Sequence, residues 1–224
     1  MHIIFFGRPG SGKGTYASRI APKLGIVHIA TGDMYRAHVA EGTELGKLAN
    51  EYMKQGQLVP DDVTIKMFKE LIEKDDAQKG FILDGFPRTM EQAKALEEMT
   101  EIDMVINFEL DEDIIIEKAL ARRICENCGN IYNIADINRG SLRLPPLLPK
   151  QEGICDKCGG KLYQRKDDNY ETIKDRQDTY VRQSSPLLEY FGDKGMVENV
   201  PVVGGPDIMV PIIIDVIERK MKKQ

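Results

Sequence analysis

Short apolar runs alternate with longer amphipathic stretches along most of the chain, as expected of buried strands and surface helices. The apolar runs predict strands at residues 2–6, 26–30, 80–84, 104–110 and 196–200. Helical periodicity predicts helices at residues 13–24, 34–41, 44–55, 60–74, 90–99, 111–123, 170–191 and 207–222. Strands that alternate with helices favour a parallel sheet covered on both faces. We therefore expect an α/β fold of three layers around a central five-stranded parallel sheet.

The composition changes between residues 125 and 168, where cysteines, glycines and prolines replace the helical periodicity. Two Cys-x-x-Cys pairs, each followed by glycine, suit four thiolates arranged around one zinc ion. The expected metal ligands are Cys125, Cys128, Cys155 and Cys158. Iron or cobalt also fits such a site, and unliganded or disulfide-paired cysteines are the alternative. The 26 residues between the two pairs exceed the usual spacing of a zinc ribbon, so this loop is expected to bulge outward.

Length and charge limit the kind of protein. The chain has 224 residues, of which 42% are hydrophobic, and a formal net charge of −5. This charge disfavours general nucleic-acid binding, which usually requires a basic face. No stretch approaches the about 18 consecutive apolar residues of a membrane helix, and the N-terminus does not resemble a signal sequence. We expect a cytoplasmic monomer whose partners are neither nucleic acid nor membrane.

Residues 7–15, with the sequence Gly-Arg-Pro-Gly-Ser-Gly-Lys-Gly-Thr, have the spacing of a phosphate-binding P-loop. A strand that breaks into a glycine-rich turn and then opens a helix directs successive backbone N–H groups at one point, which favours a polyphosphate. Gly14 stands where a serine or threonine usually ligates magnesium, so the ion must be held through Thr15, water or another carboxylate. The alternative is a glycine turn that merely ends a strand.

Residues 84–88, Asp-Gly-Phe-Pro-Arg, follow the predicted strand at 80–84. Open α/β sheets bind their ligands at this end of the strands. Asp84 can orient magnesium-bound water, and Arg88 can bind a phosphate through two hydrogen bonds. The alternative is a turn with a surface ion pair.

Together with residues 31–36, 122–123 and 165–168, these motifs resemble the adenylate kinase family in its long-lid form. The motifs occur in the order of the family and span nearly the whole chain, and Gly14 is the family's own P-loop variant. The resemblance implies reversible transfer of the terminal phosphoryl group of MgATP to AMP, giving two ADP, for adenine nucleotide homeostasis.

The resemblance also implies a division of the chain and a set of site residues. A core is expected at residues 1–29, 60–121 and 169–224, an AMP-binding insertion at 30–59, and a lid with structural zinc at 122–168. The residues expected to act in catalysis are Lys13, Asp84, Arg88, Arg122, Arg165 and Arg176. Those expected to bind ATP are Gly10, Ser11, Gly12, Lys13, Gly14, Thr15, Arg122, Ile131, Tyr132 and Pro206. Those expected to bind AMP are Thr31, Arg36, Gln57, Leu58, Val59, Gly85, Phe86, Pro87, Arg88, Gln92, Arg165 and Arg176.

One position departs from the family pattern. Many relatives have an arginine that stacks on the ATP adenine where this chain has Lys118. Lysine has no planar guanidinium for such stacking, so the choice of donor base is expected to be looser.

Two alternatives stay open on the sequence. The first is a kinase of the same fold that acts on another nucleoside monophosphate or uses GTP; by resemblance, Thr31 and Gln92 favour AMP, and the long lid disfavours UMP/CMP kinases. The second is a zinc-ribbon nucleic-acid binder with a regulatory ATP site, which the acidic charge disfavours. Closure over the substrates predicts hinges near residues 30, 60, 121 and 168.

Overall fold

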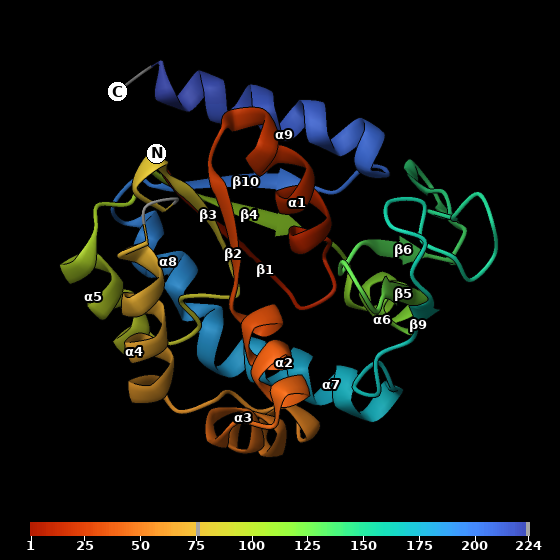
Figure 1. The fold of residues 1–224 in the computed structure, drawn as a ribbon. Coiled ribbons are helices and arrows are strands. Elements are labelled where there is room, and N and C mark those ends of the chain that lie inside the picture. Colours follow the sequence, from red (N-terminus) through yellow and green to blue (C-terminus); the bar gives the residue numbers. More distant parts are fainter. Residues whose placement is uncertain (75–76, 223–224) are drawn as a thin grey trace.

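Five parallel strands form the central sheet of the computed structural model, in the order β10-β4-β1-β3-β2 (Figure 1). The strands are β1 (His2–Gly7), β2 (Val27–Ala30), β3 (Phe81–Asp84), β4 (Met104–Glu109) and β10 (Val197–Pro201). The structure describes residues 1–74 and 77–222, so the predicted core boundary at residue 224 lies outside the described residues. Because β3 and β4 flank β1 on opposite sides, a ligand crevice is expected at the carboxyl end of β1. The predicted α/β fold with a five-stranded parallel sheet is confirmed.

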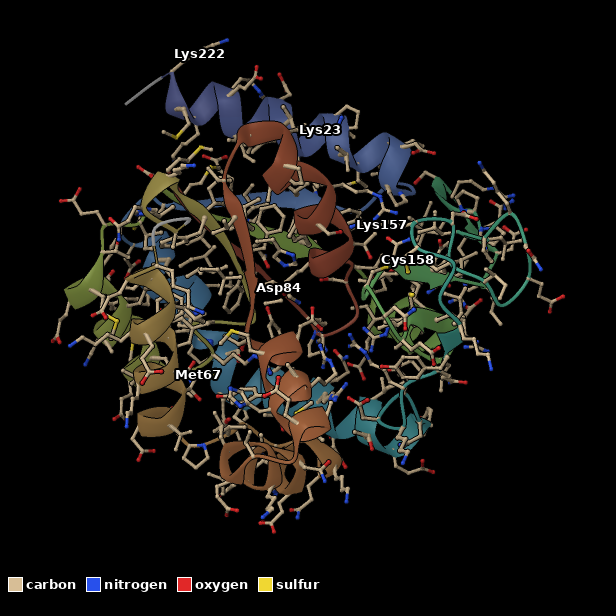
Figure 2. The ribbon with its side chains drawn as sticks, viewed as in Figure 1. Lys23, Met67, Asp84, Lys157, Cys158 and Lys222 are labelled. Carbon is tan, nitrogen blue, oxygen red and sulfur yellow. The ribbon has the colours of Figure 1, made fainter. Side chains whose placement is uncertain are left out.

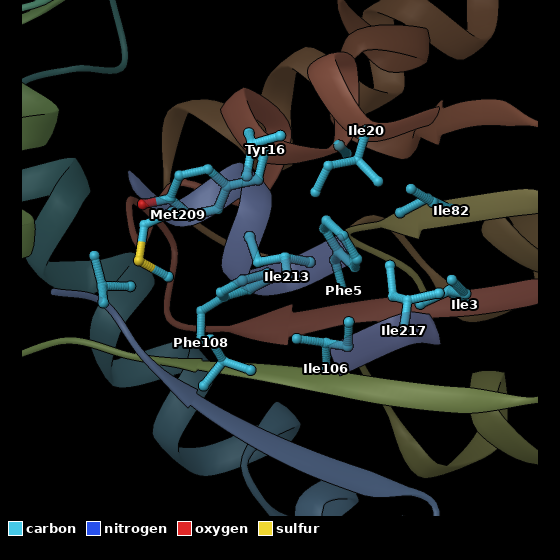
Figure 3. Close-up of a cluster of buried hydrophobic side chains, with 14 of the residues drawn as sticks. Ile3, Phe5, Tyr16, Ile20, Ile82, Ile106, Phe108, Met209, Ile213 and Ile217 are labelled. Atoms are coloured by element: carbon cyan, nitrogen blue, oxygen red, sulfur yellow. The ribbon is translucent and has the colours of Figure 1, made fainter. Parts of the chain in front are cut away.

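Helices cover both faces of this sheet because successive residues of a buried strand point to opposite faces. In β1, Ile3 and Phe5 join one hydrophobic cluster, and Ile4 and Phe6 join another. The first cluster packs against α1 (Lys13–Leu24) and α9 (Pro206–Met221). Figure 3 shows it, with Ile213 of α9 among the side chains above the strands. The helices of the second cluster are α4 (Asp61–Ile72), α5 (Met90–Met99) and α8 (Pro186–Gly192).

Two groups of elements extend from this core. The predicted pair of helices between residues 30 and 59, called here the helical insertion, consists of α2 (Thr31–Glu41) and α3 (Glu44–Lys54). After α6 (Glu112–Leu120), residues 122–168, called here the lid, form a small sheet of order β6-β5-β9 and a separate hairpin of β7 and β8. The strands of the lid are β5 (Arg122–Cys125), β6 (Ile131–Asn133), β7 (Ile137–Arg139), β8 (Leu142–Leu144) and β9 (Leu162–Tyr163).

The remaining elements are the short 3-10 helix η1 (Ala77–Lys79), α7 (Tyr170–Thr179), and the π-helical turn η2 (Tyr180–Ser184). Within the described part of the chain, no helix is both long enough and apolar enough to span a membrane.

Three predicted helices differ from the structure. The helix expected at 111–123 ends at Leu120, and Arg122 begins β5, where strand pairing with β6 overrides the helical pattern. The helix expected at 170–191 is interrupted at η2 because Pro186 has no N–H to bond to the preceding turn; Pro186 instead starts α8. The helix expected from residue 34 begins at Thr31, whose hydroxyl donates to the carbonyl of Gly85 at 2.8 Å.

The loop between the cysteine pairs also differs from its prediction. Only part of it leaves the body of the protein, because its two short strands, β7 and β8, cover the core, whereas Leu148 beyond them is 57% exposed. Ile137 of β7 and Leu144 of β8 are buried in the same cluster as α9.

The packing of α9 predicts a large difference between two adjacent isoleucines. Ile213 is 0% exposed and Ile212 is 37% exposed. We expect Ile213→Ala to lower the free energy of unfolding by about 2–4 kcal/mol, through lost burial and a new cavity, and Ile212→Ala to lower it by less than about 1 kcal/mol. Urea denaturation measures both. Equal losses would contradict this orientation of α9.

Candidate functional site

A cleft opens at the carboxyl end of the sheet, between the core, the helical insertion and the lid. Asp84, at the end of β3, lies near the middle of the molecule (Figure 2). The predicted nucleotide-site residues all line this cleft except Ser11, Phe86 and Tyr132. Ser11 and Phe86 are buried beneath it, and the hydroxyl of Tyr132 points instead to Cys155.

The P-loop side of the cleft is organised by Lys13, the first residue of α1. Its Nζ donates hydrogen bonds to the carbonyl oxygens of Gly7 (2.7 Å) and Arg8 (2.9 Å). Burial lowers the pKa of Lys13 to about 8; the Asp84 carboxylate opposes this shift, and two nearby arginines add to it. The side chain of Arg8 does not join this group, since it forms an ion pair with Glu112 at 2.9 Å.

The unusual glycine of the P-loop faces a carboxylate. A Cβ atom on Gly14 would lie 2.9 Å from Asp84 Oδ2, so a serine or threonine here would displace that group. His28 Nε2 lies 3.7 Å from the same oxygen. Burial raises the pKa of Asp84, but His28 and Lys13 outweigh it and hold the pKa below its usual value. Asp84 is therefore ionised at neutral pH, beside the glycine that makes room for it.

On the side of the helical insertion, Arg88 and Gln92 are held by hydrogen bonds from several elements. Arg88 Nε donates to the carbonyl of Gly85 at 2.7 Å, and its own backbone N–H donates to Gln92 Oε1 at 2.7 Å. Gln92 Nε2 in turn donates to Asp61 Oδ1 at 2.7 Å. One N–H and one lone pair of the Gln92 amide remain for a ligand.

Two arginines in the cleft are aligned by aspartates near the end of the lid. Arg122 forms a bidentate pair with Asp168, in which Nε lies 2.9 Å from Oδ2. Burial lowers the pKa of Arg122, but this hydrogen-bonded aspartate more than reverses the shift. Arg176 of α7 pairs with Asp167. These pairs preorganise the guanidinium groups toward the cleft.

Arg165 is less well compensated than its neighbours. Its Nη2 lies 3.2 Å from Asp33 Oδ1, and Asp33 also pairs with Arg36. Its Nε is buried and has no hydrogen-bond partner among the described residues. Burial, together with the neighbouring charges of Arg122 and Arg36, lowers the pKa of Arg165 to about 9, although Asp33 and Asp167 oppose the shift. Such a group favours an anionic ligand.

Sequence reasoning missed three side chains that organise the site. Asp61 looked like an ordinary helix-start residue and Gln177 like a polar helix residue, yet Asp61 holds Gln92, and Gln177 is fully buried with its Nε2 donating to the carbonyl of Pro9 at 2.8 Å. Asp33 joins the insertion to the lid through Arg165. The sequence signal that could have revealed them is a polar residue at a helix position where the periodicity predicts an apolar one. Of the three residues, only Gln177 shows this signal.

The four cysteines come together in the lid, where Figure 2 labels Cys158. Their sulfur atoms all lie within 4.8 Å of one another. The pairs Cys125–Cys158 and Cys128–Cys155 have sulfur separations of 3.4 and 3.6 Å. Zinc with Zn–S bonds of about 2.3 Å gives tetrahedral S–S edges of about 3.8 Å. The cluster therefore fits a zinc site, and none of the four sulfurs forms a disulfide.

Comparison with known proteins adds independent evidence. The family model described as "Adenylate kinase" matches residues 5–196. An adenylate kinase of Geobacillus sp. (strain WCH70) is 48% identical over 205 residues, which cover 89% of this chain and 90% of the relative. Adenylate kinases of Staphylococcus epidermidis and Staphylococcus aureus (strain Mu50) are 47% and 48% identical, and each alignment covers 97% of this chain and 99% of the relative.

The cysteine cluster predicts a stabilising metal. We expect about one zinc ion per purified chain in elemental analysis, and its loss in Cys128→Ser. Because a structural metal contributes directly to folding, this variant should lose at least about 2 kcal/mol of stability, or about 4–8 °C in Tm. The exposed neighbour Glu126 provides the control, since Glu126→Ala should keep the metal and the Tm. A stable wild-type lid without any bound metal would contradict the assignment of a metal site. If elemental analysis finds iron or cobalt instead, the site stands and the identity of the metal changes.

Proposed function

The chain belongs to the adenylate kinase family, and on that premise we propose how its residues share the transfer of a phosphoryl group from MgATP to AMP. The observation that carries the proposal is the convergence of one lysine and five arginines from three parts of the chain on one cleft. These residues are Lys13, Arg36, Arg88, Arg122, Arg165 and Arg176. Their mutual repulsion would be relieved by bound polyphosphate.

Phosphoryl transfer asks for little covalent chemistry from a protein, so catalysis consists of positioning and of stabilising charge on the phosphate oxygens. In the proposal, the P-loop backbone and Lys13 hold the ATP phosphates. Arg122, Arg165 and Arg176 surround the group in transfer. A protein nucleophile is not required.

Magnesium would be held on the P-loop side of the cleft. Asp84 suits it as an ionised carboxylate next to Gly14, where no Cβ intervenes, and Thr15 lines the same wall. When bound, magnesium would neutralise negative charge on the phosphates.

The acceptor would bind between the helical insertion and residues 85–92. The free N–H and lone pair of the Gln92 amide match the donor and acceptor of an adenine edge, and Asp61 sets the orientation of that amide. Thr31, Arg36 and Arg88 would surround the acceptor on this side, with the backbone of residues 57–59 alongside. This arrangement favours AMP over other monophosphates.

The same proposal includes the closing motions of the protein, its oligomeric state and its location in the cell. The helical insertion and the lid close on the core through hinges near residues 30, 60, 121 and 168, and product release with lid opening limits turnover. One chain supplies every proposed site residue, which supports action as a monomer. Four cysteines that form no disulfide and nucleotide substrates support a cytoplasmic setting.

Product analysis tests the proposal. With magnesium and ATP, we expect ADP to form with AMP but not with GMP, CMP or UMP. Lys13→Ala should lower kcat/KM by at least about a hundredfold, because the positive charge that binds the phosphates is lost. Lys23→Ala, on the exposed end of α1, is the control and should keep wild-type rates. Preference for another monophosphate would change the assigned acceptor, and efficient transfer from GTP would change the donor.

The lowered pKa of Lys13 predicts a pH dependence. Its ammonium in the free enzyme loses its proton as the pH rises through about 8, whereas an ordinary lysine stays charged to about 10.4. We expect kcat/KM for ATP to fall above pH 8, by up to about tenfold per pH unit. The pKa of Lys118 is also lowered to about 8, chiefly by burial. The profile is therefore measured in Lys118→Arg, whose side chain stays protonated. A flat profile from pH 7 to 9.5 would contradict the role of Lys13.

A further inference from the structure

The lid contains one element that the proposed chemistry does not use, the hairpin of β7 and β8. Its register pairs Ile137 with Leu144 and Arg139 with Leu142. Directly paired residues of adjacent strands point to the same face of the hairpin. Successive pairs alternate between the two faces, so every second pair shares a face. These four side chains therefore share one face, and Arg143 lies on the other.

The shared face packs on the core and not on the cysteine site. Ile137 and Leu144 are 2% and 6% exposed, and they belong to the cluster that contains Val202 and Met209 of the core. The cysteines form a separate cluster with Tyr132. In Figure 1 the green and teal lid lies beside the start of α9. Moving the lid away would expose the two buried side chains, at a cost that grows with their apolar area.

A charged contact ties the same face to the core. Arg139 Nη2 lies 2.7 Å from Glu117 Oε2, and Nη1 pairs with Asp113; both acids belong to α6. On the opposite face, Arg143 pairs with Asp136 of the lid itself, at 2.9 Å. The two arginines are similarly exposed, at 47% and 51% of their side chains, but of these two side chains only that of Arg139 forms ion pairs with the core.

The hairpin also borders the ATP side of the cleft. Ile137, Leu144 and Pro145 line it together with Lys118 and with the segment 204–206, which includes the expected ATP-binding residue Pro206. The backbone of residue 143 runs beside this segment, since its N–H lies 3.5 Å from the carbonyl oxygen of residue 203. One wall of the donor-base pocket therefore belongs to the lid, and the wall beside it belongs to the core.

We propose that the β7–β8 hairpin is a latch that closes the donor-base pocket and thereby couples donor binding to lid closure; this rests on the proposed function. The latch contacts form only when the lid is closed, which is also the state that encloses ATP. Donor affinity therefore includes the free energy of the latch. The acceptor, on the side of residues 85–92, does not contact the hairpin. Arg139 acts as a positioning residue, because it does not line the cleft, whereas Leu144 both packs on the core and lines the donor-base pocket.

Steady-state kinetics of Arg139→Ala and Arg143→Ala, in the full-length metal-loaded protein, test the latch. We expect Arg139→Ala to raise KM for ATP by about two- to fivefold, the range for one exposed ion pair. KM for AMP should stay constant, and kcat should stay constant or rise because the lid opens more easily. Arg143→Ala should match wild type. At 1 M salt the difference between wild type and Arg139→Ala should shrink, because exposed charges are screened.

Leu144→Ala tests the apolar part, with binding of a non-hydrolysable ATP analogue measured by calorimetry. We expect about tenfold weaker binding and unchanged zinc content, which shows that the cysteine site is intact. Equal effects of Arg139→Ala and Arg143→Ala, or a KM for AMP that rises as much as that for ATP, would overturn the latch. If Leu144→Ala fails to fold, the comparison of Arg139→Ala with Arg143→Ala still tests the latch. Failure of the proposed function would appear differently, as a wild-type protein that makes no ADP.

Discussion

Repulsion among buried like charges governs how the cleft of this protein is built. Lys13 and Arg165 both have lowered pKa values because they are buried among other cations. A small protein tolerates such a group only if each cation is partly compensated and if a ligand supplies the remaining negative charge. Asp84, Asp167 and Asp168 supply the first part from fixed positions. The chain is acidic as a whole, so its positive charge is local.

Distribution of the cations over three parts of the chain follows from the same repulsion. Lys13 and Arg88 belong to the core, Arg36 to the helical insertion, and Arg122 and Arg165 to the lid. If all of them lay on one rigid surface, the free protein would carry the full cost of their proximity. In the proposed function, placing them on separate parts would allow the full set to assemble when phosphate is present, and closure would then be part of catalysis.

The elements most reliably predicted from sequence were those that depend on local pattern. The five strands of the sheet are buried apolar runs, and the spacing of their residues identifies the P-loop and the cysteine pairs in the sequence. What the sequence could not predict depends on partners distant in the chain. Arg122 lies on a strand because β6 pairs with it. Asp61 is a site residue because Gln92, 31 positions away, bonds to it. The loop between the cysteines was expected to bulge outward, but part of it does not, because Ile137 and Leu144 pack on the core.

The lid thus solves two separate problems by different means. Its own buried cluster contains only Cys125, Tyr132 and Cys155, and a metal on the four cysteines would supply internal support there, in a cluster separate from that of the core. In the proposed latch, the position of the lid relative to the core would depend on contacts that break in each cycle, and a metal bound by four ligands would be unsuitable for them. A few buried apolar side chains with one half-exposed arginine form a contact of moderate strength. Shape and closure can therefore change independently: opening would separate Ile137 and Leu144 from the core and leave the cysteine cluster intact.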